Sequence, residues 1–216
     1  MLRDLAQCQD CPRLTDFRHQ VAQDHPHYHN APVAPWGDPD AAVLIVGLAP
    51  GKHGANASGY PFTGDASGVL LFKVLHRVGF CSHDHPDPLA PDFRLNGCRI
   101  TNAVKCLPPG NKPSTREIQN CARYLDAELG LLKAGGVVIA LGRIAHSAVV
   151  SALRLRQKDY IFGHASEHLL EGEIYLLNSY HCSRYNVQTR RINEDMLYRV
   201  FQRAAHLRRD QSRPHG

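Results

Sequence analysis

The sequence predicts an α/β protein: a single three-layer α/β/α domain over residues 1–216, with a central, mostly parallel sheet of four strands. Three observations predict this class. Short apolar runs alternate with helical patterns, as they do when helices cover both faces of a parallel sheet. The apolar runs are too short to cross a membrane and have the length of buried strands. The 216 residues, 43% of them hydrophobic, are enough for one sizeable core.

Four segments have the features of buried strands. They are residues 41–46, 99–104, 137–141 and 173–177. The first follows a turn rich in Gly, Pro and Asp and ends in a glycine-rich loop, so its bounds are marked on both sides. The third consists entirely of Val, Ile, Ala and Leu, which is typical of a strand that is buried on both faces.

Four helices are expected between and after these strands. They begin or run near residues 65–79, 114–132, 143–155 and 193–209. The first begins at Asp65 and ends at Gly79, a residue that commonly stops helices. In the second, Ser114 and Glu117 have the spacing of a capping box. In the last, Met196 and Val200 lie on an apolar stripe that follows the helical period.

Ligands of parallel sheets bind beyond the carboxyl ends of the strands. The loops that begin there are residues 47–64, 105–113, 142–143 and 178–188. These loops are also the most unusual stretches of the sequence, because they hold most of its Gly-rich and polar runs. Two separate signals therefore place a ligand site at this edge of the sheet.

Composition limits the cellular setting and the partners. The formal net charge of +5 is mildly basic, which is compatible with a phosphate-bearing partner but also common in proteins that bind none. The first residues have no apolar signal region, and no apolar run is long enough to span a bilayer. We therefore expect a cytoplasmic protein that has no membrane association.

The chain has seven cysteines, and disulfides are rare in the cytoplasm. Cys8 and Cys11 form a C-x-x-C pair, and Cys106 and Cys121 lie far along the chain. Two close and two distant thiolates suit either zinc or an iron–sulfur cluster, although two surface thiols give the same spacing. Cys98, beside a strand, is expected to be a small buried hydrophobe.

The loops carry few residues of catalytic type. Asp65 stands where a helix begins, and a helix cap alone would explain it. Asn102, at a strand end, can bond its own turn or read the edge of a base. His181 lies in a polar loop, where most histidines are ordinary surface residues. The glycine-rich loop lacks both standard phosphate-binding motifs, which argues against a nucleotide-binding regulator.

Six short motifs occur in one order along most of the chain. They are GLAPG at 47–51, FTGDASG at 62–68, TNAVKC at 101–106, PPGNKP at 108–113, NSYH at 178–181 and SR at 183–184. Together they resemble the type-5, or B-type, members of the uracil-DNA glycosylase superfamily. The resemblance extends from about residue 8 to about residue 201, and the combination of motifs is highly specific.

The resemblance implies a role for each matched residue. The catalytic residues would be Asp65, which orients water and stabilises the cationic sugar, and His181, which donates to the departing base. The substrate-binding residues would be Gly47, Ala49, Gly51, Phe62 and Asn102, and the DNA-binding residues Ser183 and Arg184. The ligands of a [4Fe–4S] cluster that braces the fold would be Cys8, Cys11, Cys106 and Cys121.

The substrate implied is double-stranded DNA that contains deaminated bases, uracil above all, with single-stranded DNA as a further option. The protein would act as a monofunctional glycosylase and a monomer. Leu48 replaces the Glu of the A-type relatives, so Asp65 must activate the water. Cys182 stands where the family usually has Pro. The alternative is a non-catalytic iron–sulfur protein of the same fold that binds DNA damage, but such a protein would lose Asp65 or His181.

Overall fold

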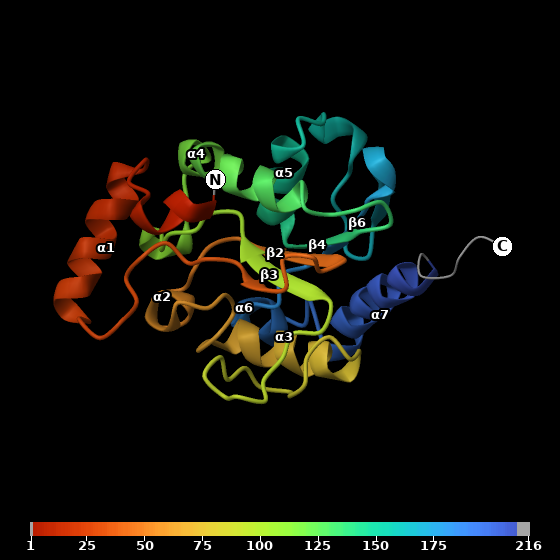
Figure 1. Ribbon diagram of the computed structural model, residues 1–216, viewed down its shortest axis with the longest axis horizontal. Helices are drawn as coiled ribbons and strands as arrows, with labels where there is room; N and C mark the ends of the chain where they lie inside the picture. The colour runs from red at the N-terminus through yellow and green to blue at the C-terminus, as the bar shows by residue number, and fades with distance from the viewer. Residues whose placement is uncertain (1, 211–216) are drawn as a thin grey trace.

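A sheet forms the centre of the molecule (Figure 1). It has six strands in the order β1-β3-β2-β4-β6-β5. The computed structural model describes residues 2–210, so residues 1 and 211–216 of the expected domain lie outside the described part. The expectation of four strands is wrong, because β1 (Trp36–Gly37) and β5 (Glu167–Leu169) flank the four predicted strands. Both edge strands are antiparallel to their neighbours. At two and three residues they are too short to produce a recognisable pattern.

The four inner strands run parallel in the interior of the sheet. They are β2 (Val43–Gly47), β3 (Cys98–Asn102), β4 (Val137–Leu141) and β6 (Tyr175–Ser179). The register pairs Gly47 with Asn102, and Leu141 with Ser179, so the strands end close together at one edge. The bounds of β4 are as expected, whereas the other three are displaced by one or two residues. Cys98 is fully buried in β3, as expected.

Helices cover both faces of the sheet and give the expected three layers (Figure 1). One face carries α3 (Ala66–Arg77) and α7 (Glu194–Asp210), and the other carries α4 (Thr115–Leu129) and α5 (Arg143–Ala152). Each face of the sheet has its own hydrophobic core, and alternate strand residues point into one or the other. Ile45 belongs to the core with α3 and α7, whereas Leu44 belongs to the core with α4 and α5. No helix among the described residues has the length and apolar character that crossing a bilayer requires.

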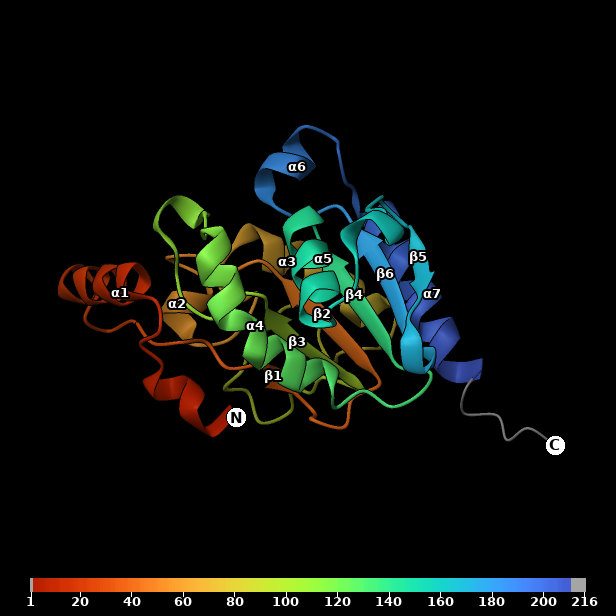
Figure 2. The same ribbon diagram turned by 90° about the horizontal axis from the view of Figure 1, so that it is seen from above.

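Three helices were not expected. They are α1 (Pro12–Asp24), α2 (Ala55–Ser58) and α6 (Arg184–Gln188), and short 3₁₀ turns occur at Leu2–Gln7, Pro109–Asn111, Gln157–Asp159 and Glu171–Glu173. Among its residues α1 buries only Leu14, Arg18 and Val21, so its apolar stripe is weak. Figure 2 shows α1 at one end of the molecule and α6 standing clear of the sheet.

The predicted capping box is present at the start of α4 and also anchors α1. Ser114 Oγ accepts from the backbone N–H of Glu117 at 3.3 Å, and the Glu117 carboxylate accepts from the N–H of Ser114 at 2.7 Å. Arg13 of α1 forms an ion pair with the same carboxylate at 2.7 Å. The residue that caps α4 thus also fixes the N-terminal helix beside it.

Candidate active site

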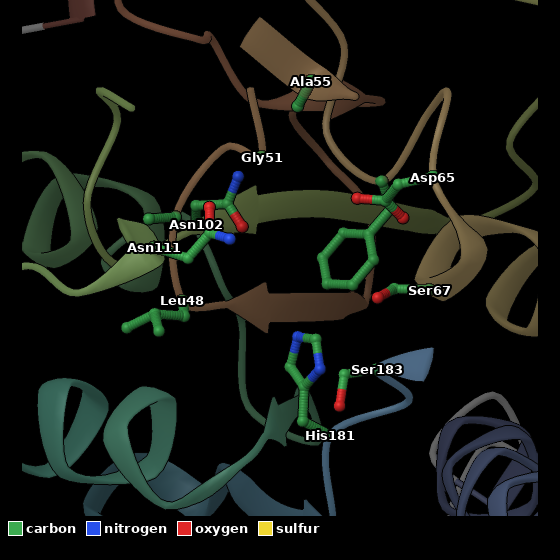
Figure 3. A pocket seen from close by; sticks show the side chains of 11 residues that line it. Leu48, Gly51, Ala55, Asp65, Ser67, Asn102, Asn111, His181 and Ser183 are labelled. Carbon is green, nitrogen blue, oxygen red and sulfur yellow. The ribbon is translucent and has the colours of Figure 1, made fainter. Parts of the chain in front are cut away.

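A pocket of about 280 Å³ lies at the carboxyl ends of the parallel strands, where the sequence places a ligand site. Its walls come from loops that follow β2, β3 and β6. It is lined by Leu48, Ala49, Gly51, Ala55, Phe62, Asp65, Ser67, Asn102, Asn111, His181 and Ser183 (Figure 3). The fold therefore brings together residues that are more than 130 positions apart in the chain.

Gly47 does not line the pocket but lets two of its walls approach. A Cβ atom at this position would lie 2.5 Å from both Asn102 Oδ1 and the ring of Phe62. Phe62 has a left-handed backbone, with φ at 59°, and its ring centre lies 6.0 Å from that of His181. Only a residue without a side chain leaves room for both groups. Gly47 therefore shapes the pocket by allowing Asn102 and Phe62 to pack closely against its backbone.

Asp65 caps α3 and also faces the pocket. Its Oδ1 accepts from the backbone N–H of Gly68 at 2.9 Å. Its Oδ2 packs close to Gly54 and Gly51. A Cβ atom added to Gly54 would lie 2.9 Å from this oxygen, and one added to Gly51 would lie 3.4 Å from it. The bond to Gly68 and the close glycines fix the carboxylate. Asp65 can therefore cap the helix through Oδ1 and still line the pocket.

His181 follows β6, and its loop is held from two sides. The side-chain amide of Asn186 donates to the carbonyl oxygen of His181 at 2.8 Å. The thiol of Cys182 donates to the carbonyl oxygen of Ser67 at 3.4 Å, which links this loop to the first turn of α3. The imidazole makes no hydrogen bond to any other residue between 2 and 210, so it can donate to a ligand.

Burial lowers the pKa of His181 below its ordinary value of 6.5, and the charge of Asp65 opposes this shift. The imidazole is therefore neutral at pH 7. We expect its NMR titration midpoint to lie below 6.5, and lower still in Asp65→Asn, where the opposing charge is gone. The resonance is assigned as the one that disappears in His181→Gln. A midpoint at or above 6.5, or one that rises in Asp65→Asn, would contradict this account.

Asn102 and Asn111 both line the pocket with their carboxamides unpaired. Neither side chain makes a hydrogen bond within the described residues. Asn102 is only 3% exposed, whereas Asn111 is exposed on the rim. Figure 3 shows the two amides on the same side of the pocket, opposite Asp65 and Ser67.

The two residues with predicted DNA contacts are placed differently. Ser183 lines the pocket and caps α6, where its Oγ accepts from the N–H of Asn186 at 3.4 Å. Arg184 is exposed on α6, outside the pocket lining, and its side chain makes no hydrogen bond or ion pair within residues 2–210. Its neighbour Tyr185 is 72% exposed.

A family model described as the uracil DNA glycosylase superfamily matches residues 34–205. The chain belongs to this superfamily. A type-5 uracil-DNA glycosylase of Thermus thermophilus is 42% identical over 212 residues, which is 95% of this chain and 96% of the relative. One of Pyrobaculum aerophilum is 38% identical and covers 93% of this chain and 89% of the relative. A type-4 uracil-DNA glycosylase of Sulfurisphaera tokodaii is 29% identical, with 76% of this chain and 70% of the relative covered. The predicted membership of the type-5 group is confirmed.

The four cysteines that the superfamily resemblance singles out surround one small, mostly apolar pocket. Cys8 and Cys11 precede α1, Cys106 follows β3 and Cys121 lies on α4. Burial raises the pKa of Cys106 to about 12 and that of Cys121 to about 11. In the part of the chain that the structure describes, no three Cys, His, Asp or Glu side chains form a group arranged for a metal ion.

Hydrogen-bond donors and cations lie against these sulfur atoms. The N–H of Lys105 donates to Cys121 Sγ at 3.3 Å, the amide of Asn120 to Cys11 Sγ at 3.5 Å, and Arg123 to Cys8 Sγ at 3.7 Å. Such donors stabilise negative charge on sulfur. The surroundings therefore favour thiolates over neutral thiols once a positively charged centre binds.

Lys105 lines the pocket that the four cysteines surround and is fully buried. Its ammonium group pairs with Glu128 Oε1 at 2.6 Å and donates to Thr101 Oγ1 at 2.5 Å. Glu128 Oε2 is buried and has no hydrogen-bond partner among the residues that the structure describes. Lys105 does not line the pocket that contains Asp65 and His181, so its ammonium group is unavailable there.

Sequence reasoning missed several residues of the site. Ala55, Ser67 and Asn111 line the pocket, and Asn186 holds the loop of His181. Asn111 lies within the PPGNKP motif. Its polar side chain, between Gly and Lys in a loop that follows a strand, was the one sign in the sequence that it could line the site. Asn186 follows Arg184 by two residues, but nothing in the sequence indicates that it bonds the carbonyl of His181.

Proposed function

We propose that the protein removes uracil from DNA by hydrolysing the N-glycosidic bond, which leaves an abasic site. The carrying observation is the carboxamide of Asn102, which is buried, makes no hydrogen bond within residues 2–210 and faces a pocket that contains Asp65 and His181. The amide opens on the pocket, so its donor and acceptor are free to bond a ligand. The N3–H of uracil is a donor for the carboxamide Oδ1, and its O4 is an acceptor for the carboxamide Nδ2, so one amide matches both groups.

The target base must leave the DNA stack before it can enter this pocket. Extrusion costs a few kcal/mol and is easiest for a mismatched base, such as uracil opposite guanine. Phe62 then stacks on the extruded ring, because its own ring is fixed beside the pocket by the close approach of Gly47. Asn102 bonds the edge of the base, so the two residues hold it in a defined orientation.

Bond cleavage places positive charge on the sugar and negative charge on the departing base. The ionised carboxylate of Asp65 stabilises the sugar and orients the attacking water through Oδ2, which the cap of α3 leaves free. His181 donates its N–H to the uracil O2, where negative charge develops. The neutral form that burial favours carries the proton this bond requires.

The enzyme is proposed to be monofunctional because no lysine among the described residues lines the pocket where the sugar would be attacked. Lys105 is buried in an ion pair outside the pocket, and Lys52 does not line it. The test is a gel assay on a labelled duplex that contains one uracil. Strand breaks that appear only after alkali support hydrolysis without lyase activity. Breaks without alkali, or none at all, would overturn the proposal.

Ser183 and Arg184 are proposed to contact the DNA backbone beside the extruded nucleotide. Arg184 is exposed and unpaired within the described chain. We expect Arg184→Ala to weaken binding to all sequences and to reduce the slope of log affinity against log salt by about one unit. Fluorescence anisotropy over a salt series measures both quantities. Unchanged affinity and slope would place α6 away from the DNA.

The pocket is proposed to accept other deaminated bases, hypoxanthine and xanthine, in addition to uracil. The superfamily members that are strict for uracil carry a bulky aromatic residue at the position of Gly51, which here leaves one wall open. Even a well-fitted wall discriminates a methyl group by only about 1–3 kcal/mol. We therefore expect excision of hypoxanthine from duplex DNA, with paired adenine and thymine spared because extruding them costs more.

Gly51→Tyr tests the open wall. The new side chain would start at ordinary contact distance, about 3.4 Å, from Asp65 Oδ2, and its ring would occupy the space that glycine leaves open. We expect the variant to lose hypoxanthine excision before uracil excision, or to lose both by crowding. Single-turnover rates on matched uracil and hypoxanthine duplexes measure this. An unmodified protein that releases uracil but never hypoxanthine, even at high enzyme concentration, would disprove the open-wall argument.

We further propose that Cys8, Cys11, Cys106 and Cys121 hold a [4Fe–4S] cluster. The donor set fits, because four thiols surround one space and N–H donors and cations approach three of their sulfurs. A four-iron cluster takes one thiolate at each iron, so its ligands need not converge on a single point. When bound, the cluster would supply cross-links among the N-terminal segment, the loop after β3 and α4.

The non-catalytic alternative, a protein that binds DNA damage without cleaving it, has less support. Such a protein has no need for a carboxylate and an imidazole in the base pocket, yet Asp65 and His181 both line it. The gel assay separates the two, because a binding protein would shift the uracil duplex without producing alkali-sensitive sites.

A further inference from the structure

Arg18 is buried on the side of α1 that faces the four cysteines. It follows Leu14 and Thr15, which line the cysteine pocket, by four and three residues, so the three side chains share one face of the helix. Only 7% of Arg18 is exposed, and its guanidinium donates to the carbonyl oxygen of Cys8 at 3.4 Å. A positive charge therefore lies inside the protein, next to the first of the proposed cluster ligands.

This guanidinium has few partners within the described chain. Its other hydrogen bond goes to the carbonyl oxygen of Asn30, also at 3.4 Å, and its Nε is buried with no partner between residues 2 and 210. No carboxylate in the same range forms an ion pair with it. A buried charge is unfavourable unless an opposite charge compensates it, and two long bonds to carbonyl oxygens do not supply one.

Lys105 and Arg123 also lie beside the sulfur atoms, but each has a carboxylate partner. Lys105 pairs with Glu128 inside the protein, and Arg123 pairs with Asp10 at 2.5 Å on a half-exposed surface. Arg18 differs from both, because its charge is buried and has no carboxylate partner in the part of the chain that the structure describes.

Cys106 is the ligand for which the charge of Arg18 matters most. The sulfurs of the other three ligands each accept a hydrogen bond from an N–H group, whereas Cys106 Sγ accepts none from residues 2–210. Burial raises the pKa of Cys106, and the positive charge of Arg18 opposes this rise. The cation thus favours a thiolate at the one sulfur of the four that lacks a donor.

A [4Fe–4S] cluster would supply the negative charge that Arg18 lacks. Four thiolates outweigh the positive charge of the iron–sulfur core, so the assembled centre is an anion. Water screens a charge poorly at a buried site, so the attraction between this anion and the guanidinium is strong. A DNA phosphate cannot take the same place, because only 7% of Arg18 reaches the surface.

We infer that Arg18 is the buried counter-ion of the cluster, which it holds in the protein and whose reduction potential it raises. This inference rests on the cluster that the proposed function includes. Reduction adds negative charge to the centre, and a buried cation beside it stabilises the added charge. The potential is therefore higher with Arg18 than it would be with a neutral residue of similar size.

Three variants separate the charge of Arg18 from its hydrogen bonds. Arg18→Gln keeps an amide that can donate to a carbonyl oxygen but removes the charge, whereas Arg18→Lys keeps the charge. Arg116→Gln is the control, because Arg116 is exposed on α4, the helix of Cys121, and its loss changes the net charge equally. The reduction potential of the anaerobic holoprotein is measured by a mediated titration with electron paramagnetic resonance. We expect it to fall in Arg18→Gln and to stay near the original value in the other two variants.

A chelator challenge measures how firmly the cluster is held. Loss of the brown colour is followed after bathophenanthroline, a chelator of ferrous iron, is added to each protein. We expect Arg18→Gln to lose its cluster about 10- to 100-fold faster than the unmodified protein, the range by which metal sites weaken when a supporting residue is removed. Arg18→Lys and Arg116→Gln should lose it at close to the original rate.

The outcomes distinguish the charge from the shape of the side chain. If Arg18→Gln cannot be purified with a cluster whereas Arg18→Lys can, the comparison supports the need for a charge. An unchanged potential and unchanged chelator resistance in Arg18→Gln would overturn the inference, and so would equal losses in Arg18→Gln and Arg18→Lys. Unmodified protein that binds no iron would instead refute the proposed cluster itself.

Discussion

Asp65→Asn is expected to slow uracil excision by about 10²- to 10⁴-fold, the range that a positioned acid–base group supplies. Asparagine is a good helix cap, so this variant keeps the start of α3 while it removes the charge that faces the sugar. The single-turnover rate on a uracil duplex measures the loss. Affinity for the same duplex should survive, because the carboxylate acts on the transition state and contributes nothing attractive to DNA phosphates.

Two comparisons separate chemistry from folding in this experiment. Asp65→Ala also loses the bond to the N–H of Gly68 and should be less stable than Asp65→Asn by about 0.5–2 kcal/mol. Ser114→Ala removes the cap of α4 instead and should lose stability while it keeps its excision rate. Near-normal turnover in Asp65→Asn would mean that another group activates water. His53, which lies between the two glycines that cradle Asp65, would then be examined first.

Cys121→Ala is expected to produce the second large effect, loss of the cluster together with much of the protein's stability. Metal binding and folding are coupled in sites of this kind, since the ligands are brought together only in the folded chain. Anaerobically purified protein should be brown and contain about four irons per chain. The variant should be colourless, low in iron and unfolded at a markedly lower temperature, as absorption, iron analysis and calorimetry would show.

Cys81→Ala is the matched control for this change. Cys81 is buried at 3% exposure, like Cys121 at 8%, but it lies away from the four sulfurs and donates to backbone carbonyls. It should lose only the small amount of stability that a buried small side chain contributes, and it should stay brown. Colourless unmodified protein that contains zinc and is fully active would rule out the cluster.

The inner sheet could be predicted from the sequence, whereas its edges could not. Buried parallel strands are continuous apolar runs, and β4 was found with its exact bounds for that reason. The edge strand β1 is only Trp36–Gly37, and β5 contains Glu, His and Leu, so neither has a pattern to detect. The sequence predicts a loop where α6 lies. The helix has only five residues and buries none of their side chains, so it leaves no apolar stripe in the sequence.

The pocket could be predicted in part because strand ends and motifs point to the same loops. Asn102 ends β3, His181 follows β6 and Asp65 begins α3, and the topology of the sheet brings such positions together. Supporting contacts are harder to foresee. The need for glycine at position 47 comes from the rings and amides of residues far along the chain. The place of Asn111 in the pocket lining depends on a left-handed turn whose geometry the motif does not reveal.

The shortness of β1 and β5 also bears on how the protein behaves in concentrated solution. An exposed sheet edge is a template for another chain, and long flat edges promote self-association. Here the two edges offer only two and three residues of backbone, and Glu167 of β5 places a charged side chain at its edge, in an ion pair with Arg203 of α7 at 2.8 Å. Neighbouring copies find little free strand to extend, so crowded or partly heated samples should resist fibre-like aggregation.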